Sequence, residues 1–125
     1  MKVKVLTYLE KRKILNSKEI DRSTLVAYGN LYLEKGAVND ALDFFEKAHF
    51  EEGIRKIRLL GLNEGDVFIF KKASKMLKIE NSRDDWNRVG EKALELGKFR
   101  YAAIAFEEAG NEEKAQELRG YMGRE

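Results

Sequence analysis

The most regular pattern of apolar and polar positions lies within residues 24–48. Two runs of apolar side chains recur there at three- and four-residue steps, the spacing that places side chains on one face of an α-helix. Gly36 separates the runs, and glycine readily takes the left-handed conformation that ends a helix. The segment therefore predicts two antiparallel helices joined by a glycine turn. The apolar positions are Leu25, Tyr28 and Tyr32 in the first run and Ala41, Phe45 and Ala48 in the second.

Much of this pattern recurs 61 residues later in the chain. Two glycines and a small–large–small triplet in one register indicate an internal repeat, with copies over about residues 24–62 and 85–123. One such hairpin buries little by itself, so we expect neighbouring hairpins to stack. The separation predicts a shortened or irregular hairpin between the copies. The matched residues are Gly29, Gly36, Ala41, Phe45 and Ala48 with Gly90, Gly97, Ala102, Phe106 and Ala109.

Shorter apolar patterns predict further helices around the two copies. Helix-capping residues are expected at Asp21 or Ser23, at Asn39 and Asp40, and at Asn81 or Ser82. Gly61 with Asn63, and Gly110 with Asn111, are interpreted as stop and start signals. We predict a single all-α domain over residues 1–125, with about eight helices alternating in direction. The additional helices are Val3–Leu15, Glu51–Leu60, Glu64–Ile79, Asp84–Leu96, Phe99–Glu108 and Glu112–Tyr121.

Both copies resemble the tetratricopeptide repeat, in which an aromatic residue precedes Leu-Gly and Tyr in the first helix, and Ala and Phe lie four apart in the second. The resemblance covers about half of the chain and implies a short right-handed solenoid of stacked hairpins. It departs from the family at Ala93, which replaces the tyrosine, and neither copy is followed by proline. The matching residues are Leu25, Tyr28, Gly29, Tyr32, Ala41 and Phe45, and then Trp86, Val89, Gly90, Ala102 and Phe106.

The resemblance implies a protein–protein interaction scaffold, because the first helix of each hairpin in that family lines a concave face that holds a peptide or partner protein. Asn30 matches the asparagine with which some members clamp a C-terminal carboxylate. Val26 and Asp84 stand where a clamp needs positive charge, so we expect a groove of mixed or mildly acidic character. Carried over by residue, the partner-binding positions are Val26, Asn30, Leu33, Asn87, Arg88 and Glu91.

Composition and candidate chemistry favour binding over catalysis. The chain has no cysteine, one histidine and no glycine-rich phosphate-binding motif. We interpret His49 as a partly exposed turn residue, and adjacent acidic pairs as helix surface, since neighbours on a helix point about 100° apart. We therefore predict no enzyme, no metal site and no cofactor. Lack of cysteine and of a signal peptide predicts a cytoplasmic protein.

Two alternatives stay open at this point. Single-stranded nucleic acid is one, because Phe68, Lys71, Lys75 and Lys78 are predicted on one helix face, where phosphate contact and stacking can combine. Self-assembly is the other. The helix over residues 112–121 has no predicted partner helix after it, so apolar surface near Tyr121 and Met122 is expected to stay open.

Overall fold

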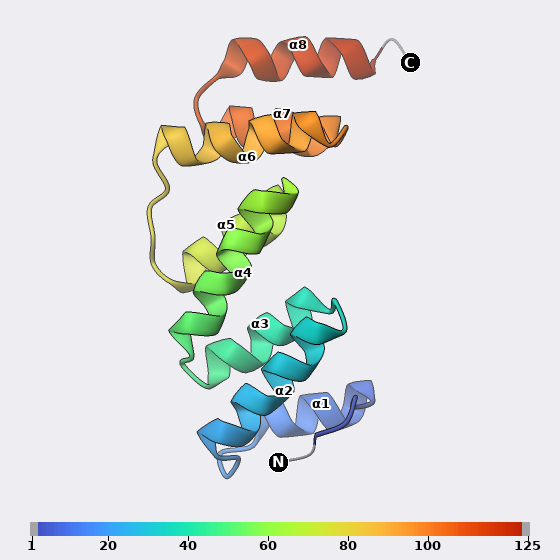
Figure 1. Cartoon of the computed structure of the whole chain (residues 1–125), viewed down its shortest axis with the longest axis vertical. Helices are drawn as coiled ribbons and strands as arrows, with labels where there is room; N and C mark the ends of the chain where they lie inside the picture. Colours follow the sequence, from blue (N-terminus) through green and yellow to red (C-terminus); the bar gives the residue numbers. More distant parts are fainter. Residues whose placement is uncertain (1–2, 124–125) are drawn as a thin grey trace. The chain divides into compact units, whose positions relative to one another are not determined.

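A computed structural model describes residues 3–123, which form eight α-helices and no strand (Figure 1). The predicted all-α class is therefore confirmed. No helix in the described range is both long enough and apolar enough to cross a membrane. The helices are α1 (Tyr8–Asn16), α2 (Arg22–Glu34), α3 (Val38–Lys47), α4 (Glu51–Glu64), α5 (Val67–Met76), α6 (Arg83–Glu95), α7 (Phe99–Glu108) and α8 (Glu112–Met122).

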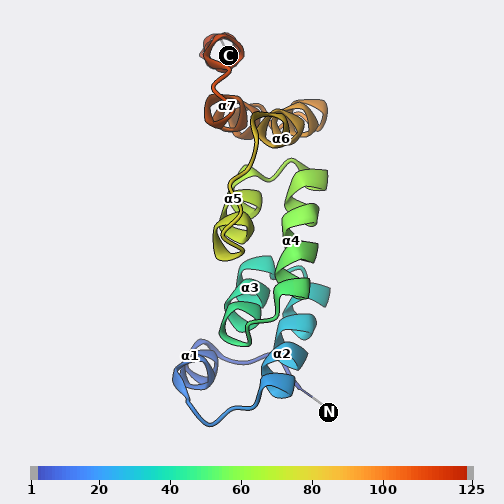
Figure 2. The same cartoon turned by 90° about the vertical axis from the view of Figure 1, so that its left-hand side faces the viewer.

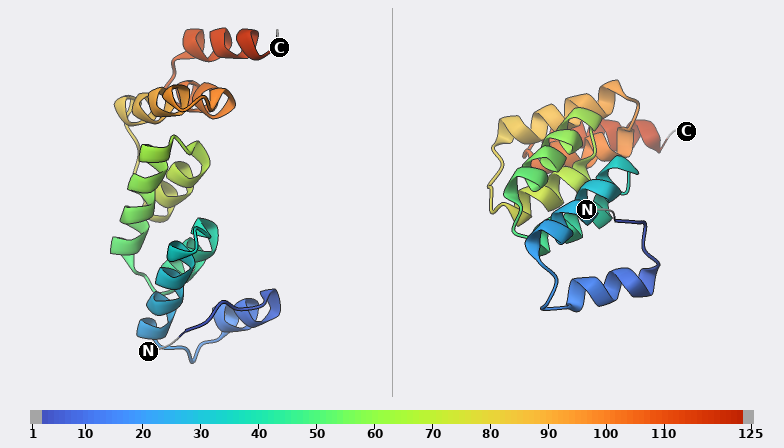
Figure 3. Two further views of the ribbon diagram at one scale, coloured as in Figure 1. Left: turned by 45° about the vertical axis from the view of Figure 1, so that its right-hand side comes forward. Right: turned by 60° about the horizontal axis from the view of Figure 1, so that its bottom comes forward.

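The chain divides into two compact units, unit 1 (Met1–Ile57) and unit 2 (Arg58–Glu125). Unit 1 contains α1, the hairpin of α2 and α3, and the first half of α4. Unit 2 contains the second half of α4 and all later helices. In unit 2, α6 and α7 form a hairpin, and α8, seen end-on in Figure 2, lies against α7. The paired α2 and α3 of unit 1 are visible in Figure 3.

Six helices, α2 to α7, end in the same way. A residue with positive φ follows each helix, and the next N–H donates to the carbonyl five positions earlier, as Ala37 does to Tyr32 at 2.9 Å. This arrangement satisfies carbonyls that the helix leaves unpaired. The turns predicted at Gly36 and Gly97 are confirmed. The positive-φ residues are Gly36, His49, Gly65, Lys78, Gly97 and Gly110.

The predicted start of two helices is also found. Asp21 accepts a hydrogen bond from the Thr24 N–H at 3.0 Å, and the hydrogen bonds from Thr24 lower the pKa of the Asp21 carboxyl. Ser82 accepts from the Asp85 N–H at 3.1 Å, while Asp85 accepts from the Ser82 N–H at 3.1 Å. These side chains satisfy N–H groups that lack partners within the helix.

Two predicted boundaries are wrong. The helix α3 begins at Val38 after Ala37, which makes no side-chain cap, so Asn39 and Asp40 lie inside the helix. The stop predicted at Gly61 is absent, because α4 continues to Glu64. Gly61 instead admits α5, since a Cβ there would lie 2.7 Å from the backbone nitrogen of Phe70.

The hairpin between the two copies is not shortened, contrary to the prediction. Its helices α4 and α5 have 14 and 10 residues, against 13 and 10 for α6 and α7. The helices α2, α4, α6 and α8 begin at residues 22, 51, 83 and 112, so successive starts are 29, 32 and 29 residues apart. The separation of 61 residues therefore holds two steps, both made of regular helices.

Both copies hold a phenylalanine ring against a glycine on the facing helix. A Cβ at Gly29 would lie 2.5 Å from Cδ1 of Phe45, and one at Gly90 would lie 2.9 Å from Cδ1 of Phe106. Both rings are 0% exposed. The glycines are thus required by close approach, and the two phenylalanines have matching surroundings, as the repeat predicts.

In unit 1, aromatic rings fill the space beside this contact. The Phe44 ring stacks on Tyr28 and Tyr32 with centroid distances of 5.3 and 5.5 Å. The Tyr32 hydroxyl accepts a hydrogen bond from the Leu6 N–H at 2.8 Å. The segment before α1 is therefore tied to the core of the α2–α3 hairpin through a tyrosine hydroxyl, a common partner for a buried aromatic residue.

Polar contacts hold α1 on α3, since none of the α1 side chains is buried. The Lys11 ammonium forms ion pairs with Asp40 and, at 2.9 Å, with Asp43. Burial lowers the pKa of Lys11, but the hydrogen bonds and charges of the two carboxylates raise it further, so the net shift is upward. The Lys47 ammonium also donates to the Leu15 carbonyl at 2.6 Å.

In unit 2, the corresponding space is filled by a neighbouring hairpin. Phe70 of α5 packs edge-on against Trp86 of α6 at 5.2 Å between centroids. A Cβ at Gly65 would lie 2.5 Å from the Ala93 backbone, so the α4–α5 turn contacts α6 directly. Small side chains on α6 and α7 make this contact possible. The buried cluster comprises Val67, Phe70, Trp86, Val89, Ala105 and Ala109.

Candidate functional site

A surface hollow of about 280 Å³ lies between α4 and α6 in unit 2. The helix α6 presents this side because Trp86, Val89 and Ala93 face the core, which leaves the intervening turns toward solvent. The predicted partner-binding residues Arg88 and Glu91 both line the hollow. The full lining is Leu62, Asn63, Arg88, Glu91, Lys92 and Glu95.

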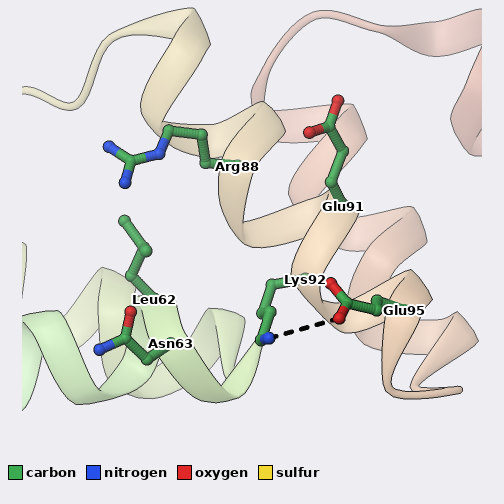
Figure 4. A pocket seen from close by; sticks show the side chains of 6 residues that line it. All are labelled: Leu62, Asn63, Arg88, Glu91, Lys92 and Glu95. Carbon is green, nitrogen blue, oxygen red and sulfur yellow. Dashed lines mark ion pairs between the residues drawn. The ribbon is translucent and has the colours of Figure 1, made fainter.

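Figure 4 shows how these side chains lie around the hollow. Leu62 extends from α4 toward α6, and the guanidinium of Arg88 reaches over the same space. Glu91 points away from α4. Lys92 pairs with Glu95 at 3.6 Å, so these two charges compensate each other. Arg88 has no ion-pair or hydrogen-bond partner within residues 3–123, and it is the exposed cation beside an apolar floor.

Asn87 lies next to this hollow in the sequence but does not line it. Its side chain is half-buried, and its Oδ1 has no hydrogen-bond partner in the described part of the chain. A buried amide oxygen without a partner costs free energy, on the order of 1–3 kcal/mol. Asn87 is therefore a polar group on the first helix of a hairpin that a bound donor group would satisfy.

The other predicted binding residues lie on α2 in unit 1. Asn30 is exposed, whereas Val26 and Leu33 are half-buried. Val26 and Leu33 lie close to the positions that face the core, Leu25 and Tyr32, which are 4% and 6% exposed. Asn30 thus offers the most accessible polar group of the predicted set on α2.

The residues of the predicted nucleic-acid face are all exposed. The Phe68 ring is 53% exposed and contacts Tyr101 edge-on, with 5.3 Å between centroids. Lys71 forms an ion pair with Glu108 at 2.8 Å, which compensates its charge. Lys78 does not share the helix face, because α5 ends at Met76 and Lys78 has a φ of 57°. The basic face of α5 is therefore Phe68, Lys71 and Lys75.

A second hollow, of about 310 Å³, lies beside α8 and is mostly apolar. The sequence offered one signal for it, the apolar residues at three- and four-residue steps in α8. Their openness to solvent near Tyr121 was expected, and Tyr121 is 50% exposed. The contribution of α6 and α7 was not predicted, because it depends on how the α6–α7 turn meets α8. The lining is Leu94, Phe99, Lys114, Glu117, Leu118 and Tyr121.

No catalytic or metal-binding group of residues was found to gather at any of these hollows. Within residues 3–123, no three or more histidine, aspartate or glutamate side chains come together as metal ligands. His49 is exposed in the α3–α4 turn with a φ of 53°, as predicted for a turn residue. Comparisons with protein-family models, with curated proteins and with solved structures gave no match.

Proposed function

We propose that the chain is a non-catalytic scaffold resembling tetratricopeptide proteins, and that it binds a peptide segment of another protein in the hollow between α4 and α6. One observation carries this proposal. Arg88, an unpaired cation, overhangs the apolar side chain of Leu62 on a neighbouring first helix of a hairpin. Charged groups that gain a partner on binding contribute more than neutral ones, and an apolar floor adds burial.

The chemistry of the hollow suggests what the bound segment carries. A carboxylate suits Arg88, which otherwise lacks an anion within the described residues. An adjacent apolar side chain suits Leu62, and the Asn63 amide beside it can donate to a peptide carbonyl. The proposed ligand is therefore an acidic residue next to an apolar one. The resemblance to tetratricopeptide repeats and the cytoplasmic location stay predictions.

A peptide-display experiment tests the proposal. A random-peptide phage library is selected on the chain, and the affinity of a synthetic selected peptide is measured by fluorescence anisotropy. Arg88→Ala should weaken binding at least about tenfold, because it removes a charge-assisted hydrogen bond. Arg83→Ala is the matched control, since Arg83 is exposed on α6 outside the hollow. Equal affinity of both variants and the unchanged chain would refute the placement at α4 and α6.

The predicted residues on α2 are tested in the same assay. Asn30→Ala removes the accessible amide of that set while leaving the packed residues Leu25 and Tyr32 in place. A loss of affinity would show that unit 1 takes part in binding the selected peptide. Unchanged affinity would remove Asn30 from the predicted binding residues.

A second candidate function is binding of single-stranded nucleic acid, favoured by the half-exposed Phe68 ring beside exposed lysines. Stacking on the ring and phosphate contacts would then act together. Binding of a fluorescent oligonucleotide should weaken steeply with salt and be lost in Lys71→Glu with Lys75→Glu. Because Lys71 is already paired with Glu108, Lys75→Glu alone should have the larger effect of the two single changes. Binding that ignores salt would exclude this candidate.

A further inference from the structure

The helix α1 carries the largest exposed apolar surface of unit 1. Tyr8 and Leu9 are 74% and 73% exposed, and Val5 just before the helix is 55% exposed. Tyr8 and Arg12 lie one helical turn apart and line a hollow of about 320 Å³ on α1. Exposed apolar side chains that cluster, unlike isolated ones, mark interaction surfaces.

The hollow beside α8 in unit 2 is the most apolar concave surface described. Leu94, Phe99 and Leu118 form its apolar wall, and the Tyr121 ring contacts Phe99 edge-on at 5.6 Å between centroids. Glu117 stands at its rim and has no partner within residues 3–123. Lys114 is occupied, because its ammonium lies 4.7 Å from the centroid of the Phe106 ring.

The two surfaces carry opposite charge. Residues 3–20 hold five basic and two acidic side chains, whereas residues 107–119 hold five acidic and two basic ones. Lys11 is used inside unit 1 by Asp40 and Asp43, but Arg12 has no ion-pair partner within residues 3–123. Opposite charge across two apolar patches steers association and selects the partner.

We propose that α1 of one copy of this chain binds the hollow beside α8 of a second copy. Tyr8 would enter the apolar hollow, and Arg12 would pair with Glu117 at its rim. The apolar groups contribute the affinity, since burying an aromatic side chain removes a large area from water. The charges fix which surface meets which, because α1 against α1 or α8 against α8 would oppose like charges.

This contact joins two different surfaces, so it is heterologous. Each bound copy still presents one free α1 and one free α8 hollow, and the assembly therefore grows into open chains or closes into a ring. The mean mass should rise with protein concentration and continue past that of a dimer unless a ring closes. This self-association is independent of the peptide-binding proposal, because none of its residues lines the hollow between α4 and α6.

Charge exchange on the full chain tests this proposal, with sedimentation velocity from micromolar to millimolar concentration as the measurement. Arg12→Glu and Glu117→Arg should each shift self-association to at least about tenfold higher concentration, because like charges then meet. An equimolar mixture of the two variants should associate as the unchanged chain does, since each contact again joins opposite charges. Far-UV circular dichroism confirms that both variants keep their helices.

Two control variants change charge elsewhere. Lys35→Glu and Glu80→Arg alter exposed residues outside both surfaces, and each should associate like the unchanged chain. An unchanged chain that stays monomeric over the whole range would overturn the proposal. So would single variants that associate normally, or a mixture that fails to recover association. In either of these last two cases, the mass data would exclude the pairing of α1 with α8.

Discussion

The two copies of the repeated hairpin share one contact and differ in what surrounds it. In both, a buried phenylalanine ring lies on a glycine of the facing helix. The first copy then fills its flank with its own rings, Tyr28, Tyr32 and Phe44. The second copy has Val89, Ala93 and Ala105 at the corresponding positions, and a neighbouring hairpin fills the space. The repeated residues thus build a hairpin, and the variable ones determine what packs beside it.

The difference follows from side-chain volume. Large rings close the flank of the first hairpin and leave only polar contacts for α1 to make. Small residues in the second hairpin let the α4–α5 turn approach so closely that Gly65 lies against the Ala93 backbone. Interiors are packed as densely as organic crystals, so neither arrangement tolerates the residues of the other.

Exchanging Tyr32 and Ala93 should break this comparison most severely. Tyr32→Ala leaves a cavity beside Phe44, and Ala93→Tyr forces a ring into a fully buried site, each at a cost of about 3 kcal/mol or more. Urea unfolding measures both changes. The fluorescence of Trp86, the chain's single tryptophan and a residue of unit 2, should report the loss in Ala93→Tyr. A stable Ala93→Tyr would show that the neighbouring hairpin does not require a small residue there.

The shared contact is tested by alanine at each glycine. Gly29→Ala and Gly90→Ala should both destabilise the chain, by about 3 and about 2 kcal/mol, because the new Cβ overlaps the ring and less so at Gly90. Gly120→Ala is the matched control, since a Cβ there meets nothing within 4 Å. It should instead stabilise α8 by about 0.5–1 kcal/mol through helix propensity. Equal effects at all three positions would contradict the ring–glycine contact.

A third test uses two arginines in equivalent register. Arg58 donates to Ser74 Oγ at 2.9 Å, lies 4.8 Å from the centroid of Phe70 and pairs with Asp85. Arg119, its counterpart, makes an exposed pair with Glu107. Arg58→Ala should cost about 2 kcal/mol. Arg119→Ala should cost less than about 1 kcal/mol, as exposed pairs contribute little.

Urea denaturation under identical buffer compares the two arginine variants. Salt separates them further, because screening weakens exposed pairs more than half-buried ones. The difference between the variants should therefore persist at high salt. Equal costs would mean that the contacts with Ser74 and Phe70 contribute nothing beyond a surface ion pair.

Much of the fold was predictable because it depends on local chemistry. Left-handed turns favour glycine, so Gly36 and Gly97 marked two helix ends. Gly61 was misjudged, because a glycine needed for close approach looks the same in sequence as one needed for a turn. Only the position of Phe70 distinguishes the two roles. The sequence contains no signal for that tertiary contact.

The candidate site was predictable to the extent that it lies on a repeated helix. Register alone selected Arg88 and Glu91 on α6. Leu62 and Asn63 were missed, because the predicted helix stopped at Leu60, before the turn of α4 that faces α6. A helix carried through Gly61 would have placed both residues next to the second copy. Unpaired charge is likewise a tertiary property, and the sequence could not separate Arg88 from the paired Lys92.

The smallest expected effect concerns the helix ends at His49 and Gly110, which are equivalent in the two copies. His49 holds a φ of 53° without the freedom of glycine, and its side chain is exposed. The left-handed conformation costs an L-residue about 1–2 kcal/mol, and the larger entropy of unfolded glycine offsets about half of that gain. His49→Gly should therefore stabilise the chain by about 0.5–1 kcal/mol, and Gly110→Ala should destabilise it by about 1 kcal/mol. Lys78→Gly, at the same kind of helix end, should repeat the gain. Thermal unfolding followed by circular dichroism measures all three, and a loss of stability in His49→Gly would mean that the imidazole itself makes a stabilising contact in the turn.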